Sequence, residues 1–220
     1  MEAPQQLTSF RNSLKKASSK EELAAATRGL LKAFPNRYKP LREHLESGNK
    51  DISERLRFLR ATVEGDFLDI GSYDGFFVLE LEKEAHKAAG VDMMDEAINF
   101  SLLEQKKYPN SHASFYKAYA EDIPLEDNSF DTTIQSHTLE YVFDPAVAIS
   151  EAARITRTGG KLIVIVPVSL GNDPTHIRVV EPAWLEDELR KYGNLNQQQT
   201  VGDGVAYICR IDKSKEIFRS

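Results

Sequence analysis

The sequence of 220 residues contains a single cysteine and no long apolar run, and each absence excludes a class of protein. Cys209 has no partner in the chain, which excludes an intramolecular disulfide, and its place in the run VAYICRI predicts a buried strand residue. The longest apolar run, Leu162 to Val168, is interrupted by Pro167 and is far shorter than a membrane span. The N-terminus also lacks the apolar stretch of a signal peptide, so we expect a cytoplasmic protein without membrane contact.

The charge of the chain is uneven. Hydrophobic residues make up 41% and charged residues 28% of the sequence, which is typical of a globular protein with a packed core. A net charge of -6 argues against a general nucleic-acid binder. Residues 1–64 carry 13 Lys and Arg against 8 Asp and Glu, whereas the remaining residues carry 15 against 26. This basic segment fits either a solvated helical surface that complements the acidic body or a surface for an anionic substrate or partner.

Residues 1–64 are expected to form a helical extension ahead of a domain that covers residues 65–220. The spacing of a capping box, in which Glu stands three residues after the cap, occurs at Ser19 and again at Asp51. Three helices are predicted, over 20–34, over 38–46 and from residue 51 onward. Ile52, Leu56 and Leu59 share one face of the third helix, which should therefore pack on the domain.

From Phe67 onward, short apolar segments alternate with amphipathic ones. The strands are predicted at 67–70, 90–93, 114–118, 131–136, 161–166, 196–201 and 205–211. The helices are predicted at 77–89, 95–108, 145–156 and 182–192. Asp144 followed by Pro145 marks the start of the third of these helices, and Gly159–Gly160 should close it. This alternation predicts an α/β fold with a doubly wound, mostly parallel sheet, and the final hairpin, with its turn GDG, adds an antiparallel edge.

The stretch FLDIGSYDGFF lies where the first strand turns into the first helix, which is the ligand-binding edge of such a sheet. Gly71 and Gly75 allow a tight turn, and Asp69 can orient the loop or bind an ammonium group. Tyr73 stands where a phosphate-binding loop would have a third glycine. Asp92 closes the next strand, 17 residues after Gly75, near the spacing of an acid that binds both hydroxyls of a ribose. A helix cap is the alternative role for Asp92.

Five segments in order resemble the class I S-adenosylmethionine-dependent methyltransferases, in their small-molecule branch. They are DIGSYDG, GVDMMDEAI, YAEDIPLEDNSFD, SHTLEYVFDP and RITRTGGKLIVIVP, within about residues 65–168. The resemblance implies the Rossmann-like, seven-stranded methyltransferase sheet. It also implies S-adenosyl-L-methionine as the cofactor and methyl transfer to an O or N nucleophile, less readily C, of a small molecule.

The resemblance assigns cofactor-binding residues by position. Asp69, Gly71, Ser72, Tyr73 and Gly75 would surround the methionine half, with the ring of Tyr73 as a wall near the cofactor or the acceptor. Asp92 would bind the ribose hydroxyls and Met93 would lie against the adenine. Tyr119, Ala120 and Glu121 would meet the adenine edge, although Tyr119 replaces the usual acidic residue. Ser136 would face the methionine part.

His137 and His176 are the candidate catalytic bases, because both are predicted at the carboxyl edge of the sheet. A positioning or packing role is the alternative for each. His176 together with Arg178 could instead hold an acidic group of the acceptor. In the extension, Arg37, Tyr38, Lys39 and Arg42 would form a lid that faces an anion. A homodimer remains open. The His and Asp residues show no recognised metal-ligand spacing, so no metal is expected.

Three other functions compete with this assignment. A nicotinamide enzyme would share the glycine loop and the acid, but the EDIPLEDNSFD loop and the lack of a Tyr-x-x-x-Lys pair argue against it. An RNA-modifying methyltransferase is the second, and the acidic body and the missing RNA-binding module argue against it. The third is a cofactor-binding regulatory protein that transfers no methyl group. No Asn-Pro-Pro-Tyr clamp and no Cys-Pro pair is present, which disfavours methylation of base or glutamine nitrogens and of cytosine carbon.

Overall fold

A computed structural model describes residues 12, 14–33, 40–169 and 177–218. The helices of more than three residues are α2 (Lys20–Ala33), α3 (Leu41–Glu46), α4 (Lys50–Thr62), α5 (Phe76–Leu81), α6 (Asp95–Gln105), α7 (Pro145–Ile155) and α8 (Pro182–Tyr192). The strands are β1 (Phe67–Ile70), β2 (Ala88–Asp92), β3 (Ser114–Lys117), β4 (Phe130–Ser136), β5 (Thr156–Pro167), β6 (Gly193–Val201) and β7 (Gly204–Ile211). Among the residues described, no helix has the length and apolarity that crossing a membrane requires.

The strands form one seven-stranded sheet in the order β3-β2-β1-β4-β5-β7-β6. All pairings from β3 to β5 are parallel, whereas β7 runs antiparallel to both β5 and β6. The predicted doubly wound sheet with an antiparallel hairpin at its edge is confirmed. Because the order reverses direction between β1 and β4, the carboxyl ends of these two strands flank the switch point at which ligands bind in such sheets.

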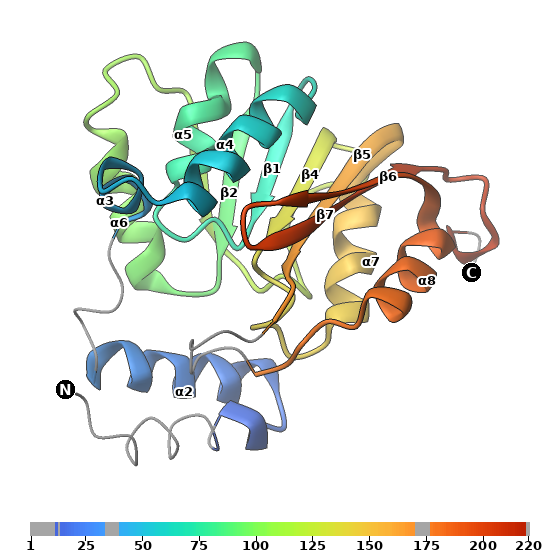
Figure 1. Ribbon diagram of the computed structural model, residues 1–220, viewed down its shortest axis with the longest axis horizontal. Helices are drawn as coiled ribbons and strands as arrows, with labels where there is room; N and C mark the ends of the chain where they lie inside the picture. The colour runs from blue at the N-terminus through green and yellow to red at the C-terminus, as the bar shows by residue number, and fades with distance from the viewer. Residues whose placement is uncertain (1–11, 13, 34–39, 170–176, 219–220) are drawn as a thin grey trace.

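Helices cover both faces of the sheet (Figure 1). One apolar cluster joins α4 and α5 to side chains of β1, β4, β5 and β7, while the other cluster joins α7 and α8 to the alternate side chains of the same strands. The burial of Ile52, Leu56 and Leu59 confirms that α4 packs on the sheet. Cys209 is buried in β7 as predicted, and burial raises the pKa of its thiol to about 11, so this cysteine is unreactive at neutral pH.

Three local predictions were wrong. The helix predicted over 77–89 ends at Leu81, because Ala88 already pairs with Phe67 in the sheet. The cap of α4 is Asn49, whose side chain accepts a hydrogen bond from the backbone N–H of Ile52 at 3.1 Å, and Asp51 instead lies in the first turn. Gly159–Gly160 lies inside β5, where the register with β4 shifts, and does not close α7.

Other predicted boundaries hold. The side chain of Asp144 caps α7 by accepting from the N–H groups of Ala146 and Val147, and Pro145 fills the first helical position. The hydroxyl of Ser19 accepts from the N–H of Glu22 at 3.2 Å, as expected at the start of α2. In the picture, α2 lies at one end of the sheet and covers neither face (Figure 1).

The turn of the β6–β7 hairpin docks on the first turns of α4. The backbone N–H of Gly202 donates to Glu54 at 3.1 Å, and that of Asp203 donates to Oδ1 of Asp51 at 3.3 Å. Gly202 has φ +61°, and a Cβ built on it would lie 2.1 Å from Oδ1 of Asp51. Glycine is therefore needed at this position for two reasons: the backbone is left-handed, and a side chain would collide with α4.

Substitution of Gly202 by alanine should destabilise the protein by about 2–3 kcal/mol, because the left-handed conformation costs roughly 1–2 kcal/mol and the contact with Asp51 adds to it. Gly48→Ala is the matched control, since Gly48 has φ +83° and open space around its Cβ position. The free energy of unfolding in urea measures both losses. Equal losses of unfolding free energy in the two variants would show that the close contact between Gly202 and Asp51 adds nothing to the cost of the substitution.

Candidate functional site

The Gly71–Gly75 loop connects β1 to α5 and packs against its neighbours. The backbone N–H groups of Gly71 and Ser72 donate to the carbonyl of Val91 at 2.8 and 2.9 Å. Gly71 has φ +79°, and a Cβ on it would lie 2.5 Å from the hydroxyl oxygen of Thr138. That hydroxyl donates to the carbonyl of Ile70 at 2.9 Å. The loop therefore joins the carboxyl ends of β1, β2 and β4.

Asp92 holds the middle of this loop. Its Oδ2 accepts from the N–H of Tyr73 at 3.0 Å, and its Oδ1 accepts from the N–H of Met94 at 2.9 Å. Tyr73 has φ +50°, a conformation that is uncommon for an aromatic residue, and its carbonyl accepts from Ser101 at 3.0 Å. Backbone hydrogen bonds therefore hold Tyr73 in the conformation that glycine would adopt without cost.

Two carboxylates at the strand ends are desolvated. Burial raises the pKa of Asp69, which is 2% exposed, to about 7, and the nearby charge of Asp92 acts in the same direction. Burial also raises the pKa of Asp92 to about 6, although the N–H groups of Met94 and Tyr73 oppose the shift. Because buried carboxylates are stabilised by a positive charge beside them, this pair suits a cationic ligand.

Arg55 from α4 reaches the same strand ends, and our sequence reasoning missed it. Its guanidinium donates from Nη2 to Asp51 at 2.6 Å and from Nη1 to the hydroxyl of Ser136 at 3.3 Å. The guanidinium also lies 5.4 Å from the ring centre of Phe77. Arg55 is 6% exposed, yet its buried Nε has no hydrogen-bond partner among the residues that the structure describes. This donor therefore has the capacity for one more hydrogen bond, which an anionic or polar group would satisfy.

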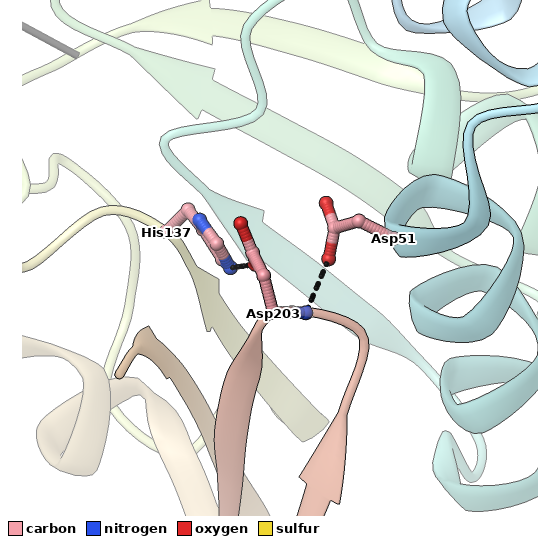
Figure 2. A group of neighbouring side chains, drawn as sticks. All are labelled: Asp51, His137 and Asp203. Carbon is pink, nitrogen blue, oxygen red and sulfur yellow. Dashed lines mark hydrogen bonds and ion pairs between the residues drawn. The ribbon is translucent and has the colours of Figure 1, made fainter. Parts of the chain in front are cut away.

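His137 follows β4 directly and lies between two carboxylates. Its Nδ1 is 3.6 Å from Oε1 of Glu140, which is fully buried, and its Nε2 is 3.5 Å from Oδ1 of Asp203 in the β6–β7 turn. Figure 2 shows His137 and Asp203 together with Asp51 of α4. His137 has φ +54°, and its N–H donates to the carbonyl of Ile165 at 2.8 Å. The fold thus brings together one predicted base and three acids to which the sequence analysis gave no role in the site.

The predicted adenine loop is tied to two distant segments. Oε1 of Glu121 accepts from the N–H groups of Phe143 and Asp144, at 2.7 and 3.2 Å, so Glu121 holds the start of α7. The ammonium of Lys20 lies 5.0 Å from the ring centre of Tyr119. Ala120 and Met93 are half-buried. Glu121 therefore has a structural partner, while the cofactor contacts of this loop stay a prediction.

Two arginines that were expected to meet an anionic acceptor have partners within the protein, and the other residues of that prediction lie outside the described residues. Arg178 donates to the carbonyls of Leu139, Val142 and Phe143, so it fixes the loop after β4. Arg42 pairs with Glu80 at 2.9 Å and with Glu104 at 3.8 Å, so its charge has partners within the protein, and its part in a lid stays a prediction. His176, Arg37, Tyr38 and Lys39 lie outside the described residues.

Comparison with known proteins agrees with this arrangement. Residues 68–164 match the family described as "Methyltransferase domain". The chain is 31% identical over 101 residues to 2-methyl-6-phytyl-1,4-hydroquinone methyltransferase of Arabidopsis thaliana, covering 46% of this chain and 30% of that protein. It is also 31% identical over 119 residues to demethylmenaquinone methyltransferase of Renibacterium salmoninarum, covering 51% and 48% of the two chains. The chain thus spans less than half the length of these two relatives.

Solved structures share the fold. A SAM-dependent methyltransferase of Thermotoga maritima, described as a possible histamine N-methyltransferase, superposes with a TM-score of 0.66 at 23% identity, covering 84% of this chain and 99% of the other. The YcgJ protein from Bacillus superposes with a TM-score of 0.60 at 19% identity, covering 67% and 72%. Residues 68–164 thus match a methyltransferase domain, and the fold is that of solved S-adenosylmethionine-dependent methyltransferases. The cofactor of this family is S-adenosyl-L-methionine.

The raised pKa of Asp69 predicts a dependence of stability on pH. A carboxyl whose pKa is about 7 in the folded state and near 3.8 in the unfolded state favours folding while it is protonated, and that contribution is lost as the pH rises toward 7. Asp69→Asn should therefore raise the free energy of unfolding relative to wild type by about 2–4 kcal/mol at pH 8, with little gain near pH 4.

Urea unfolding at both pH values measures this difference. Asp187→Asn, at a side chain that is 82% exposed on α8, is the control for loss of one charge. A gain for Asp69→Asn that is the same at pH 4 and pH 8 would contradict the assigned burial effect.

Proposed function

We propose that this chain transfers a methyl group from S-adenosylmethionine to a small-molecule acceptor. The observation that carries the proposal is the pair of desolvated carboxylates, Asp69 and Asp92, behind the Gly71–Gly75 loop, within the segment that matches the methyltransferase family. S-adenosylmethionine carries a sulfonium and an ammonium group, so its charge complements this pair. When bound, it supplies an electrophilic methyl group.

The residues of this chain have separable roles toward the cofactor in this proposal. Asp92 accepts from the ribose hydroxyls, and the Gly71–Gly75 loop with Ser136 lies along the methionine part. Arg55 faces the methionine carboxylate in this proposal, because its buried Nε has no partner in the described part of the chain and its guanidinium bonds Ser136. Met93, Tyr119 and Ala120 remain the proposed adenine contacts, and the ring of Tyr73 remains a proposed wall of the site.

The acceptor in this proposal is a hydroxylated aromatic ring. The names of the two relatives specify a hydroquinone and demethylmenaquinone, and a further relative is named a C-methyltransferase. We therefore propose a ring carbon as the methyl acceptor ahead of the O or N atom expected from the sequence. Removal of a proton from a ring hydroxyl makes both the oxygen and the neighbouring ring carbon more nucleophilic. His137 is the proposed proton acceptor, because it lies at the end of β4, directly after Ser136.

The wider expectations from the sequence remain proposals. They are a cytoplasmic location, an anionic acceptor and a homodimer. The pairing of Arg42 and Arg178 with groups of the protein removes two of the cations that supported an anionic acceptor. An uncharged or weakly acidic phenol fits the remaining residues around His137 better.

An acceptor screen tests the proposed function. The full chain is incubated with S-adenosylmethionine and a panel of 1,4-naphthohydroquinones, benzohydroquinones and catechols, and mass spectrometry measures methylated product and S-adenosylhomocysteine. Product from a hydroquinone, reduced at least tenfold in His137→Gln, supports the proposal. If calorimetry detects no binding of S-adenosylhomocysteine, the proposed methyl transfer is wrong.

The role of Asp92 predicts a specific loss of affinity. Asp92→Ala leaves two ribose hydroxyls without an acceptor and should weaken S-adenosylhomocysteine binding by about 1–3 kcal/mol. Asp95→Ala, three residues on at an exposed position on α6, is the control and should keep the wild-type affinity. Isothermal calorimetry measures both, with the melting temperature as a check on folding. An affinity for Asp92→Ala equal to that of the control would refute the role.

The role of Arg55 can be separated from its packing by the choice of ligand. S-adenosylhomocysteine carries the amino-acid carboxylate, whereas 5′-methylthioadenosine lacks it. Arg55→Gln should weaken binding of the first by about 10- to 100-fold and leave binding of the second within a factor of two or three, because only the first forms the charge-assisted bond. Equal losses for both ligands would show that Arg55 acts only by shaping the site.

A further inference from the structure

A cavity of about 570 Å³ lies between α4 and the strands β6 and β7. We call it the α4–β6 groove, and Arg57, Lys161, Gln197 and Arg210 are among the residues that line it. In the sheet, Lys161 is paired with Thr132, four residues before the end of β4, so it lies about 13 Å along the strand from the cofactor edge. No residue that lines the groove has been assigned to the cofactor or to the acceptor.

Arg57 lies on the face of α4 that lines the groove, and it is exposed. The other two arginines of α4, Arg55 and Arg60, pair with the carboxylates of Asp51 and Glu80 at 2.6 Å each. Among the residues that the structure describes, no carboxylate pairs with Arg57. Its charge is therefore available to a ligand in the groove.

The opposite wall holds two cations side by side. Lys161 of β5 and Arg210 of β7 are directly opposite each other in the antiparallel pair, so their side chains share one face of the sheet. Like charges in this arrangement repel and destabilise the sheet. Glu64 pairs with Lys161 at 2.6 Å, whereas Arg210 donates to the carbonyl of Gly159 at 2.7 Å and has no acidic partner in the described part of the chain. An anion in the groove would relieve this repulsion.

The groove is basic although the body of the protein is acidic. Three cations line it and Glu54 is the one carboxylate among its lining residues, which gives a net charge of +2. The carboxylate of Glu54 already accepts from the N–H of Gly202 at 3.1 Å. Residues 65–220, by contrast, carry 15 Lys and Arg against 26 Asp and Glu. Such a local excess of positive charge attracts an anion of about two charges, which is the charge of a phosphate monoester at neutral pH.

The side chains of β6 add neutral hydrogen-bonding groups. Gln197 and Gln199 line the groove, and so does Asn196. The pairing of β6 with β7 shifts between Leu195 and Gln197, so Asn196 has no paired residue in β7. Bulges of this kind change the direction of a side chain. Because an amide both donates and accepts hydrogen bonds, these three side chains suit the hydroxyl groups of a ligand.

We propose that the α4–β6 groove is a second ligand site, which binds a phosphorylated sugar. Arg57 and Arg210 bind the phosphate, since guanidinium groups match phosphate oxygens with paired N–H donors, and the amides of β6 bind the sugar hydroxyls. The volume of the groove is within the range of small-molecule sites. The site does not depend on methyl transfer, because its residues are separate from those of the proposed function.

The experiment uses ribose 5-phosphate as the probe and the full chain labelled with ¹⁵N. NMR spectra recorded during the titration should show saturable shifts of backbone signals from residues 54–61, 196–201 and 208–210. Signals of residues 71–75, in the glycine loop, should stay in place. Ribose should not bind at the same concentrations, and inorganic phosphate should bind at least tenfold more weakly than ribose 5-phosphate.

Variants identify the cations that bind the probe. Arg57→Gln and Arg210→Gln should each weaken binding of ribose 5-phosphate about tenfold, because each removes a charge-assisted hydrogen bond. Arg60→Gln on α4 and Arg190→Gln on α8 are the matched controls, with side chains that are both 53% exposed, and should bind within a factor of two of wild type. The melting temperature of each variant without ligand checks its folding.

Four results would overturn the proposal. They are the absence of saturable shifts, shifts confined to residues 71–75, an equal affinity for inorganic phosphate, and an equal loss in Arg60→Gln. The second would place the probe at the glycine loop, the third would leave a site for a bare anion, and the fourth would show general attraction to positive charge. Calorimetry with S-adenosylhomocysteine on the same samples tests the proposed function separately, because either ligand can bind without the other.

Discussion

The buried guanidinium of Arg55 balances the acidic end of the sheet. It bonds Asp51 and Ser136 and lies on the ring of Phe77, and its charge lowers the pKa of Asp69, against the burial that raises it. Removal of one partner from a buried ion pair leaves the other without compensation and costs several kcal/mol. The position of α4, the closure of the β6–β7 turn on it and the approach of Asp203 to His137 all depend on this contact between the extension and the sheet.

The sheet and the glycine loop could be predicted from the sequence because their signals are local. Periodicity two marks the strands, and Gly71, Gly75 and Asp92 stand at spacings that a turn and a strand end require. Arg55 could not be found in this way, because an arginine on a helix that packs by Ile52, Leu56 and Leu59 looks like any exposed charge. Its role follows only from the tertiary placement of α4, to which no motif refers.

The errors at the element ends have the same origin. Both Asp51 and Asn49 are suitable residues for the N-cap of α4. Asn49 takes this position, because the Asp51 carboxylate instead bonds Arg55 and the β6–β7 turn. The segment after Leu81 continues in helical periodicity, but pairing of Ala88 with Phe67 extends β2 and stops the helix. In both cases a contact distant in sequence outweighed a local preference of about 1 kcal/mol.

Only part of the site lies within the segment that matches the family of methyltransferase domains. The matched segment, residues 68–164, contains the glycine loop, Asp92 and Ser136, to which we assign cofactor contacts, and His137, the proposed base. The residues that surround His137 from outside, Asp51, Arg55 and Asp203, lie before and after this segment. Of these three, Arg55 is the proposed partner of the methionine carboxylate, whereas Asp51 and Asp203 lie near the proposed base. We therefore expect the residues that select the acceptor to lie where α4 and the β6–β7 turn meet the end of β4.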